Sequence, residues 1–140
     1  MTREAPKKNL TISNEHELEM LDNALPIIKK LLVVLLDNDV SSIMGFFRHD
    51  VYRYFFLLTF MVEYFEGSEI SQEHAISLVP QKFASRIKRL QVLKQAVELG
   101  YIIEESSTVD KRRRIYSPSA ELVLEFLDGA NNINDIFNKS

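Results

Sequence analysis

Residues 71–119 read SQEHAISLVPQKFASRIKRLQVLKQAVELGYIIEESSTVDKRRRIYSPS. They open with two helical patterns. Ser71 can cap the first, and Pro80 marks its end because proline cannot continue a helix. The second pattern runs from about residue 82 to residue 99 and stops at Gly100, a residue type that tolerates the left-handed conformation after a helix. The stretch therefore predicts two consecutive helices joined by a short turn.

A β-hairpin follows the second helix. Residues 101–105 read as an apolar strand, residues 106–111 as a polar turn and residues 113–117 as the returning strand. Two helices followed by a hairpin with a charged tip are the outline of a winged helix-turn-helix, with residues 82–99 as the recognition helix and residues 106–114 as the wing. We therefore predict a mainly α fold with a small β-hairpin wing.

Positive charge is concentrated in the same stretch. The chain has 17 Lys and Arg against 20 Asp and Glu, so its net charge is −3. Nine of the 17 basic residues lie between Lys82 and Arg114 with only four acidic ones, so this window carries +5 and the rest of the chain −8. A basic segment in an otherwise acidic protein indicates binding to a polyanion.

The composition argues against several other functions. The 140 residues, 46% of them hydrophobic, suit one domain with its own core. The chain has no Cys, and its three His residues lack the spacing of a helical metal site. No stretch resembles a phosphate loop or a nucleophile elbow. We therefore expect no enzymatic activity, no metal and no cofactor.

The protein is expected in the cytoplasm, without a membrane span. Its longest apolar run, from Leu25 to Leu36, is interrupted by Lys29 and Lys30, and its 12 residues are well short of the roughly 20 that cross a bilayer. Residues 1–9 are polar and charged, unlike a secretory signal. The absence of Cys suits a reducing compartment.

The chain is predicted to form a single domain after a short arm. Residues 1–12 carry charge and no period, which indicates a flexible N-terminal arm. Residues 13–140 form the domain, with a core at 51–128 flanked by terminal helices. Residues 37–39 read as a break after the first of these helices.

The first terminal helix is predicted from Asn14, which can cap it, to Leu36. Leucines and isoleucines recur along it at spacings of three and four. Pro26 should kink this helix or split it in two. The helix has more apolar surface than one small domain readily covers, which indicates dimerisation.

A strongly hydrophobic helix is predicted from Val51 to Phe65, ended by Glu66-Gly67. One stripe of it is apolar at helical spacing: Val51, Phe55, Leu58, Val62 and Phe65. Because the helix is apolar on most sides, it should be buried. The alternative is that it lines a pocket for a small-molecule effector, in which case the residues to watch are Tyr52, Tyr54 and Tyr64.

Two further helical faces are predicted from periodicity. The inward face of the recognition helix should hold Phe83, Ile87, Leu90, Leu93 and Val97. Ser119 can cap a last helix that Asp128-Gly129 closes, and residues 133–137 could then dock as a separate short helix.

The hairpin and the helix before it resemble those of the multiple antibiotic resistance regulator (MarR) family of bacterial transcription factors. In that family the wing commonly reads as an Asp, a basic residue and an Arg, followed by an apolar strand that ends in Ser, an apolar residue and Thr. Here the corresponding residues are Asp110-Lys111-Arg112, then Ile115-Tyr116-Ser117-Pro118-Ser119. Gly100-Tyr101-Ile102-Ile103 is similar to the family's Gly and apolar strand after the recognition helix. The resemblance covers roughly residues 51–128.

The resemblance implies a transcriptional regulator that binds double-stranded DNA as a homodimer built from terminal helices. It also implies that Asp110 orients Arg112 or stabilises the turn of the wing. The chain departs from the family in two places. Its C-terminal helical part, 119–138, is shorter than the usual dimerising helix, and the segment between Ser71 and Gly100 is a few residues longer.

The candidate DNA-contacting residues follow from what each groove requires. A helix in the major groove needs small or polar residues near its N-terminus to reach base edges, and Ser85, Arg86 and Arg89 fit this role. Lys82 and Lys88 would contact phosphates. The wing would reach the flanking backbone or minor groove, although the alternation of a strand prevents all its cations from pointing one way; they are Lys111, Arg112, Arg113 and Arg114.

One alternative belongs to a different class of function. Winged helices host several functions, so the fold alone does not decide among them. The chain could be a winged-helix protein–protein interaction module without specific DNA binding, with its basic surface meeting an acidic partner.

Overall fold

The computed structural model of the protein describes residues 14–36 and 41–138. These residues group into two compact units, one of residues 14–36 with 132–138 and one of residues 41–131. The predicted arm, 1–12, and the predicted break at 37–39 lie outside the described residues. None of the described helices has the length and apolar character needed to cross a membrane.

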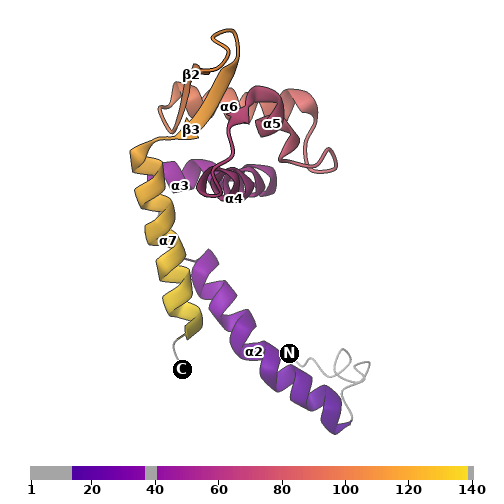
Figure 1. The fold of residues 1–140 in the computed structure, drawn as a ribbon. Coiled ribbons are helices and arrows are strands. Elements are labelled where there is room, and N and C mark those ends of the chain that lie inside the picture. The colour runs from indigo at the N-terminus through magenta and orange to yellow at the C-terminus, as the bar shows by residue number, and fades with distance from the viewer. Residues whose placement is uncertain (1–13, 37–40, 139–140) are drawn as a thin grey trace. The chain divides into compact units, whose positions relative to one another are not determined.

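The 41–131 unit contains four helices in the order of the chain, then the start of a fifth, with three short strands between them (Figure 1). The bounds are α3 (Ser42–Phe47), α4 (Val51–Phe65), β1 (Ile70–Ser71), α5 (Gln72–Ser77), α6 (Arg86–Glu98), β2 (Ile102–Ser106), β3 (Arg114–Pro118) and α7 (Ala120–Asn138). The loop between β2 and β3, at the top of Figure 1, projects beyond α5 and α6. The predicted mainly helical fold with a β-hairpin wing is confirmed.

The sheet has one strand that the sequence did not predict. It has the order β1-β3-β2, with both pairs antiparallel. The register places Glu104 of β2 opposite Tyr116 of β3, and Ile70 of β1 on the other side of Tyr116. Because β1 is only two residues long, it carries no period from which a strand could be read. Its pairing fixes the start of α5 against the base of the wing.

Capping residues set most of the helix boundaries. The side chains of Ser41, Asp50 and Ser71 each accept a hydrogen bond from a backbone N–H in the first turn of α3, α4 and α5. Gly67 and Gly100 follow α4 and α6 with φ of 89° and 81°, a conformation that glycine adopts without steric cost. The predicted helix stops at both glycines are confirmed.

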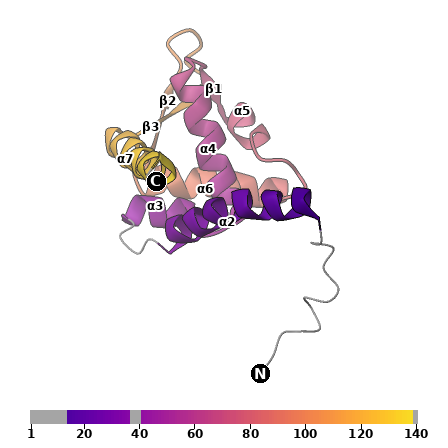
Figure 2. The same ribbon diagram turned by 90° about the horizontal axis from the view of Figure 1, so that it is seen from below.

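The core of the 41–131 unit forms around one face of α4, so the prediction that this helix is buried on most sides is only partly confirmed. Phe56, Leu57, Phe60 and Met61 are buried, whereas the predicted stripe is half exposed, with Val51 at 68%, Leu58 at 40%, Val62 at 53% and Phe65 at 48%. The rings of Phe56 and Phe60 stack with centroids 5.3 Å apart. In Figure 2, α4 lies between β3 on one side and α5 on the other.

The first helix, α2 (Glu15–Leu35), begins where predicted. Asn14 accepts a hydrogen bond from the N–H of Glu17 at 2.8 Å and so caps it. The helix continues through Pro26 without being split, and none of its residues is buried. Lys30 of α2 donates to the backbone oxygen of Phe137 at 2.8 Å, which joins α2 to the end of α7 within their unit.

The last helix is longer than predicted. Ser119 caps α7 by accepting a hydrogen bond from the N–H of Leu122 at 3.0 Å, as expected. The predicted stop at Asp128-Gly129 is wrong, because α7 continues to Asn138 and includes the segment predicted as a separate helix. Gly129 does not have a positive φ, so nothing in its backbone ends the helix.

Tyr116 fastens the wing to the rest of the unit. Tyr116 is 4% exposed. Its hydroxyl donates to Oε2 of Glu104, and the hydroxyl oxygen also lies 3.3 Å from Oε1 of Gln72 in α5. Burial, followed by the hydrogen bond and charge of Glu104, raises the pKa of Tyr116 above its ordinary value. The folded protein therefore favours the neutral phenol.

This shift predicts a loss of stability at alkaline pH. Above about pH 10, the ordinary pKa of tyrosine, the unfolded chain loses the proton that the folded chain keeps, so unfolding becomes easier by roughly 1.4 kcal/mol per pH unit. Urea unfolding at pH 8 to 11 should show that Tyr116→Phe is less stable than the wild type below pH 10 and that the difference narrows above it. Tyr101→Phe is the control, since that hydroxyl makes no hydrogen bond among the described residues. The same pH dependence in both variants would contradict the assignment.

Candidate nucleic-acid interface

The helix predicted to read DNA starts later than expected. Ser85 is its N-cap, with Oγ accepting from the N–H of Lys88 at 3.3 Å, so α6 begins at Arg86 and not near residue 82. Lys82 lies in the turn before the helix, and its Nζ is 5.3 Å from the centre of the Phe83 ring. Ser85 and Lys82 are therefore exposed at the N-terminal end of α6 without being part of it.

The faces of α6 differ from the predicted ones. The buried residues are Arg89, Val92, Leu93 and Ala96. Ile87, predicted to face inward, is 70% exposed. Together with the exposed Gln91 and Lys94 it follows helical spacing along the side opposite the buried residues. The predicted inward face is right for Leu93, which is buried, and wrong for Ile87. Ile87 and Gln91 were therefore not predicted as candidate contacts.

Arg89 is buried, against the prediction that it lies on an outer face of the helix. Its exposed fraction is 8%. Nη1 donates to the backbone oxygens of Ile76 at 3.0 Å and Val79 at 3.2 Å, and Nε donates to that of Ser85 at 3.4 Å. These carbonyls end α5 and form the turn, so Arg89 holds the two helices of the helix-turn-helix together. Its guanidinium is not placed to reach a base edge.

Arg86 is exposed but paired. Its Nη1 lies 3.1 Å from Oε2 of Glu73, and its Nη2 lies 2.5 Å from Oε1 of the same carboxylate, so the contact is bidentate. The hydrogen bond with Arg86 is the main cause that lowers the pKa of Glu73, and the hydrogen bond with Glu73 likewise raises the pKa of Arg86. Glu73 lies in the first turn of α5, so the pair bridges α5 and α6.

The loop of the wing is held in shape by hydrogen bonds within it. Ser107 is 2% exposed, and its Oγ accepts from the N–H of Val109 at 3.2 Å and of Asp110 at 3.4 Å. The N–H of Ser107 donates to the oxygen of Arg113 at 2.8 Å, which closes the loop. Oδ1 of Asp110 accepts from the N–H of Arg112 at 3.1 Å and lies 3.6 Å from Nε of the same residue. Asp110 thus stabilises the turn and orients Arg112, as the resemblance implied.

The four cations of the wing are all exposed, and they differ in their partners. The side chain of Arg112 is 94% exposed beside Asp110. Nη1 of Arg113 lies 3.5 Å from Oε1 of Glu69, the residue before β1. Among the residues that the structure describes, Lys111 and Arg114 have no ion pair, and the same holds for Lys88 in α6. The structure thus gathers the cations on α6 and the wing, apart from the buried Arg89.

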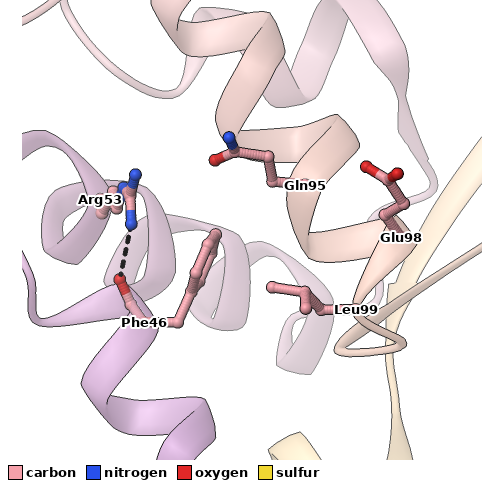
Figure 3. Close-up of a pocket in the computed structure, with 5 residues that line it drawn as sticks. All are labelled: Phe46, Arg53, Gln95, Glu98 and Leu99. Atoms are coloured by element: carbon pink, nitrogen blue, oxygen red, sulfur yellow. Dashed lines mark hydrogen bonds between the residues drawn. The ribbon is translucent and has the colours of Figure 1, made fainter.

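A pocket of about 590 Å³ lies beside the C-terminal half of α6, away from its capped end (Figure 3). Phe46, Arg53, Gln95, Glu98 and Leu99 line it. Nη1 of Arg53 donates to the backbone oxygen of Phe46 at 3.4 Å. A second pocket, of about 250 Å³, is lined by residues of α4 and by Leu78. Neither is lined by the tyrosines of α4 that were proposed for an effector.

Among the described residues, no group of three or more His, Asp and Glu side chains could hold a metal ion. The exposed cations of residues 82–114 lie on α6, on the turn before it and on the wing, a placement typical of a winged helix.

Comparison with known proteins finds similar solved structures. No protein-family model and no curated protein matches the chain. Among solved structures, the heme sensor protein PefR from Streptococcus agalactiae, in complex with heme, has a TM-score of 0.46 at 16% identity over 89% of this chain and 80% of that one. The transcriptional regulator PA4135 has a TM-score of 0.46 at 14% identity over 76% and 77%. The adhesin competence repressor AdcR from Streptococcus pyogenes has a TM-score of 0.42 at 11% identity over 86% and 75%.

The similar structures are a sensor, a regulator and a repressor.

The role of Arg89 predicts that removing its hydrogen bonds lowers the stability of the fold. Arg89→Met keeps the length of the side chain but leaves the oxygens of Ile76 and Val79 without their donor, so the free energy of unfolding should fall by about 1–3 kcal/mol. Arg86→Met is the matched control, because that side chain is exposed, and it should change stability by less than about 1 kcal/mol. Urea unfolding measures both. Equal losses in the two variants would contradict the structural role of Arg89.

Proposed function

We propose that this protein is a transcriptional regulator that binds double-stranded DNA, with α6 in the major groove and the wing on the flanking backbone or minor groove. The observation that carries the proposal is the gathering of exposed cations on these two elements in a chain that is otherwise acidic. The proposed contact residues are Lys82, Ser85, Arg86, Lys88, Lys111, Arg112, Arg113 and Arg114. Arg89 is left out, because backbone carbonyls occupy its guanidinium.

The outer face of α6 offers side chains suited to reading base edges. Arg86 can donate to O6 and N7 of guanine, and Gln91 can form a bidentate contact with adenine. Ile87, exposed between them along the helix, can contact the methyl group of thymine. Three exposed side chains on one helix that suit three different bases favour a protein that prefers certain DNA sequences over one that binds any duplex.

The remaining cations suit phosphate contacts, which position the protein without reading sequence. Lys88 is the third residue of α6 and lies near the positive N-terminal end of the helix, where an anion is also favoured. The wing cations lie on a turn that hydrogen bonds to Ser107 and Asp110 hold in shape. A fixed turn lowers the entropy that the wing would lose on binding.

A salt titration tests the proposal. If about six cations neutralise phosphates, the logarithm of the affinity should fall with the logarithm of salt concentration with a slope of roughly −5. Fluorescence anisotropy with a duplex selected from a random pool should show this slope, and Arg112→Ala should make it shallower by about 0.9. Lys29→Ala, which removes an exposed cation from α2, is the control and should leave the slope unchanged.

An interaction module is the second candidate, and one observation favours it. Ile87 is a large apolar side chain exposed among basic ones, which also suits an acidic, amphipathic partner protein. The same titration separates the two functions. A folded protein that binds no duplex at low salt would be such a module and would refute the DNA-binding proposal.

We further propose that the regulator is a cytoplasmic homodimer joined through its terminal helices. None of the 21 residues of α2 is buried. The leucines and isoleucines along one side of it are exposed to solvent, with Leu18 at 47%, Leu25 at 41%, Ile28 at 48% and Leu32 at 52%. Monomeric proteins rarely leave such a continuous apolar surface uncovered. A two-fold pair would present two copies of α6 about one DNA turn apart, roughly 34 Å.

The dimer can be tested on the stripe itself. Ile28→Lys with Leu32→Lys should convert the protein to a monomer, because each change would bury an unpaired charge at the interface. Analytical ultracentrifugation at micromolar concentration would measure the mass. Asn23→Lys, on the polar side of the same helix, should leave the dimer intact. A wild-type protein that sediments as a monomer would refute the dimer.

A further inference from the structure

Two of the proposed DNA-contacting arginines are occupied by carboxylates from one short segment. Arg86 of α6 is paired with Glu73, and Arg113 of the wing is paired with Glu69. The partners are 13 and 44 residues apart in the chain. Both acids belong to the segment that leads through β1 into α5, so a single stretch of backbone places a carboxylate beside each of the two binding elements.

The two carboxylates are held in place by secondary structure. Glu73 lies in the first turn of α5, which Ser71 caps by accepting a hydrogen bond from the N–H of His74 at 3.2 Å. Glu69 precedes β1, and β1 pairs with the same strand that follows Arg113. The positions of the carboxylates are therefore fixed by the fold, and they do not depend on a long flexible chain reaching across the surface.

These pairs have little to offer the stability of the fold. The side chains of Arg86 and Glu73 are 57% and 68% exposed, and those of Arg113 and Glu69 are 51% and 42% exposed. Ion pairs this open to solvent contribute little to folding. A carboxylate does, however, present two oxygens to a guanidinium much as a phosphate does. Glu73 contacts Arg86 with both carboxylate oxygens, and Glu69 contacts Arg113 with one. Each acid therefore occupies donors that a DNA phosphate could otherwise use.

We propose that Glu69 and Glu73 are intramolecular competitors of DNA phosphate that suppress non-specific binding and so raise specificity. On any duplex, Arg86 and Arg113 can gain a phosphate only by giving up a carboxylate, so the exchange adds little affinity. The base contacts of Ile87 and Gln91 are not reduced in this way, because both side chains are exposed and neither is charged. The inference rests on the proposed DNA binding.

Removing the competitors should strengthen non-specific binding in a salt-dependent manner. In Glu69→Gln with Glu73→Gln, both arginines become free to neutralise phosphates, and the salt slope should steepen by about 0.9 for each. The advantage of this variant over the wild type should therefore shrink about 12-fold between 50 and 200 mM salt. Anisotropy with a random-sequence duplex measures the effect. The affinity for a selected duplex should rise less, so that the ratio between the two duplexes falls.

Two controls separate this mechanism from a general change of charge. Glu105→Gln removes one negative charge from β2, where the side chain is exposed and has no ion pair among the described residues. It should leave the salt slope unchanged. Adding Arg86→Gln to Glu73→Gln should abolish the gain of the single variant, because the effect passes through that pair. A gain from Glu105→Gln as large as that from Glu73→Gln would overturn the proposal.

The outcomes distinguish this inference from the function on which it rests. A folded wild-type protein and a folded double variant that both bind no duplex at low salt would refute the DNA-binding function itself. A wild-type protein that binds DNA, with a double variant of the same affinity and slope, would refute only the competition by Glu69 and Glu73. A slope that is steeper in Glu73→Gln and returns to the wild-type value when Arg86→Gln is added would support both.

Discussion

The position of α6 depends on the buried guanidinium of Arg89. Its hydrogen bonds to the oxygens of Ile76 and Val79 satisfy carbonyls that the end of α5 leaves without partners inside the helix. A buried cation is costly unless such acceptors surround it. The same contact fixes the rotation of α6 about its axis, because Arg89 can reach these oxygens only if its side of the helix faces α5. That rotation turns Ile87 and Gln91 outward, and it determines which side chains can meet a ligand.

The wing is fixed by a different set of interactions. Tyr116 is buried where β2, β3 and α5 meet, while Ser107 and Asp110 accept the backbone N–H groups of the loop. The cations at the tip are therefore mounted on a turn whose backbone is already hydrogen-bonded. Since α6 and the wing are both held by polar contacts with the β1–α5 segment, this segment sets the distance between the two binding elements. The same segment supplies Glu69 and Glu73, so its geometry bears on affinity as well as on shape.

Local signals predicted the fold better than they predicted the site. Ser71, Ser119 and Gly100 mark their boundaries through contacts within four or five residues, and these contacts do not depend on the rest of the molecule. The orientation of α6 could not be read in this way. An apolar period indicates which residues share a face, but the burial of Arg89 in place of Ile87 depends on carbonyls that α5 contributes. The pairs Arg86–Glu73 and Arg113–Glu69 were likewise invisible, because 13 and 44 residues separate their members.

Because the charge is unevenly distributed, the orientation of the protein on DNA matters more for binding than its net charge. Outside residues 82–114 the chain carries −8, which opposes approach to DNA from most directions. At physiological salt, charges farther apart than about 8 Å are largely screened, so attraction arises only where the cations of α6 and the wing come close to phosphates. Among the described residues, the acids from outside this window that contact its cations are Glu69 and Glu73. A duplex that fits the outer face of α6 gains base contacts there, whereas a phosphate at Arg86 or Arg113 must first displace a carboxylate.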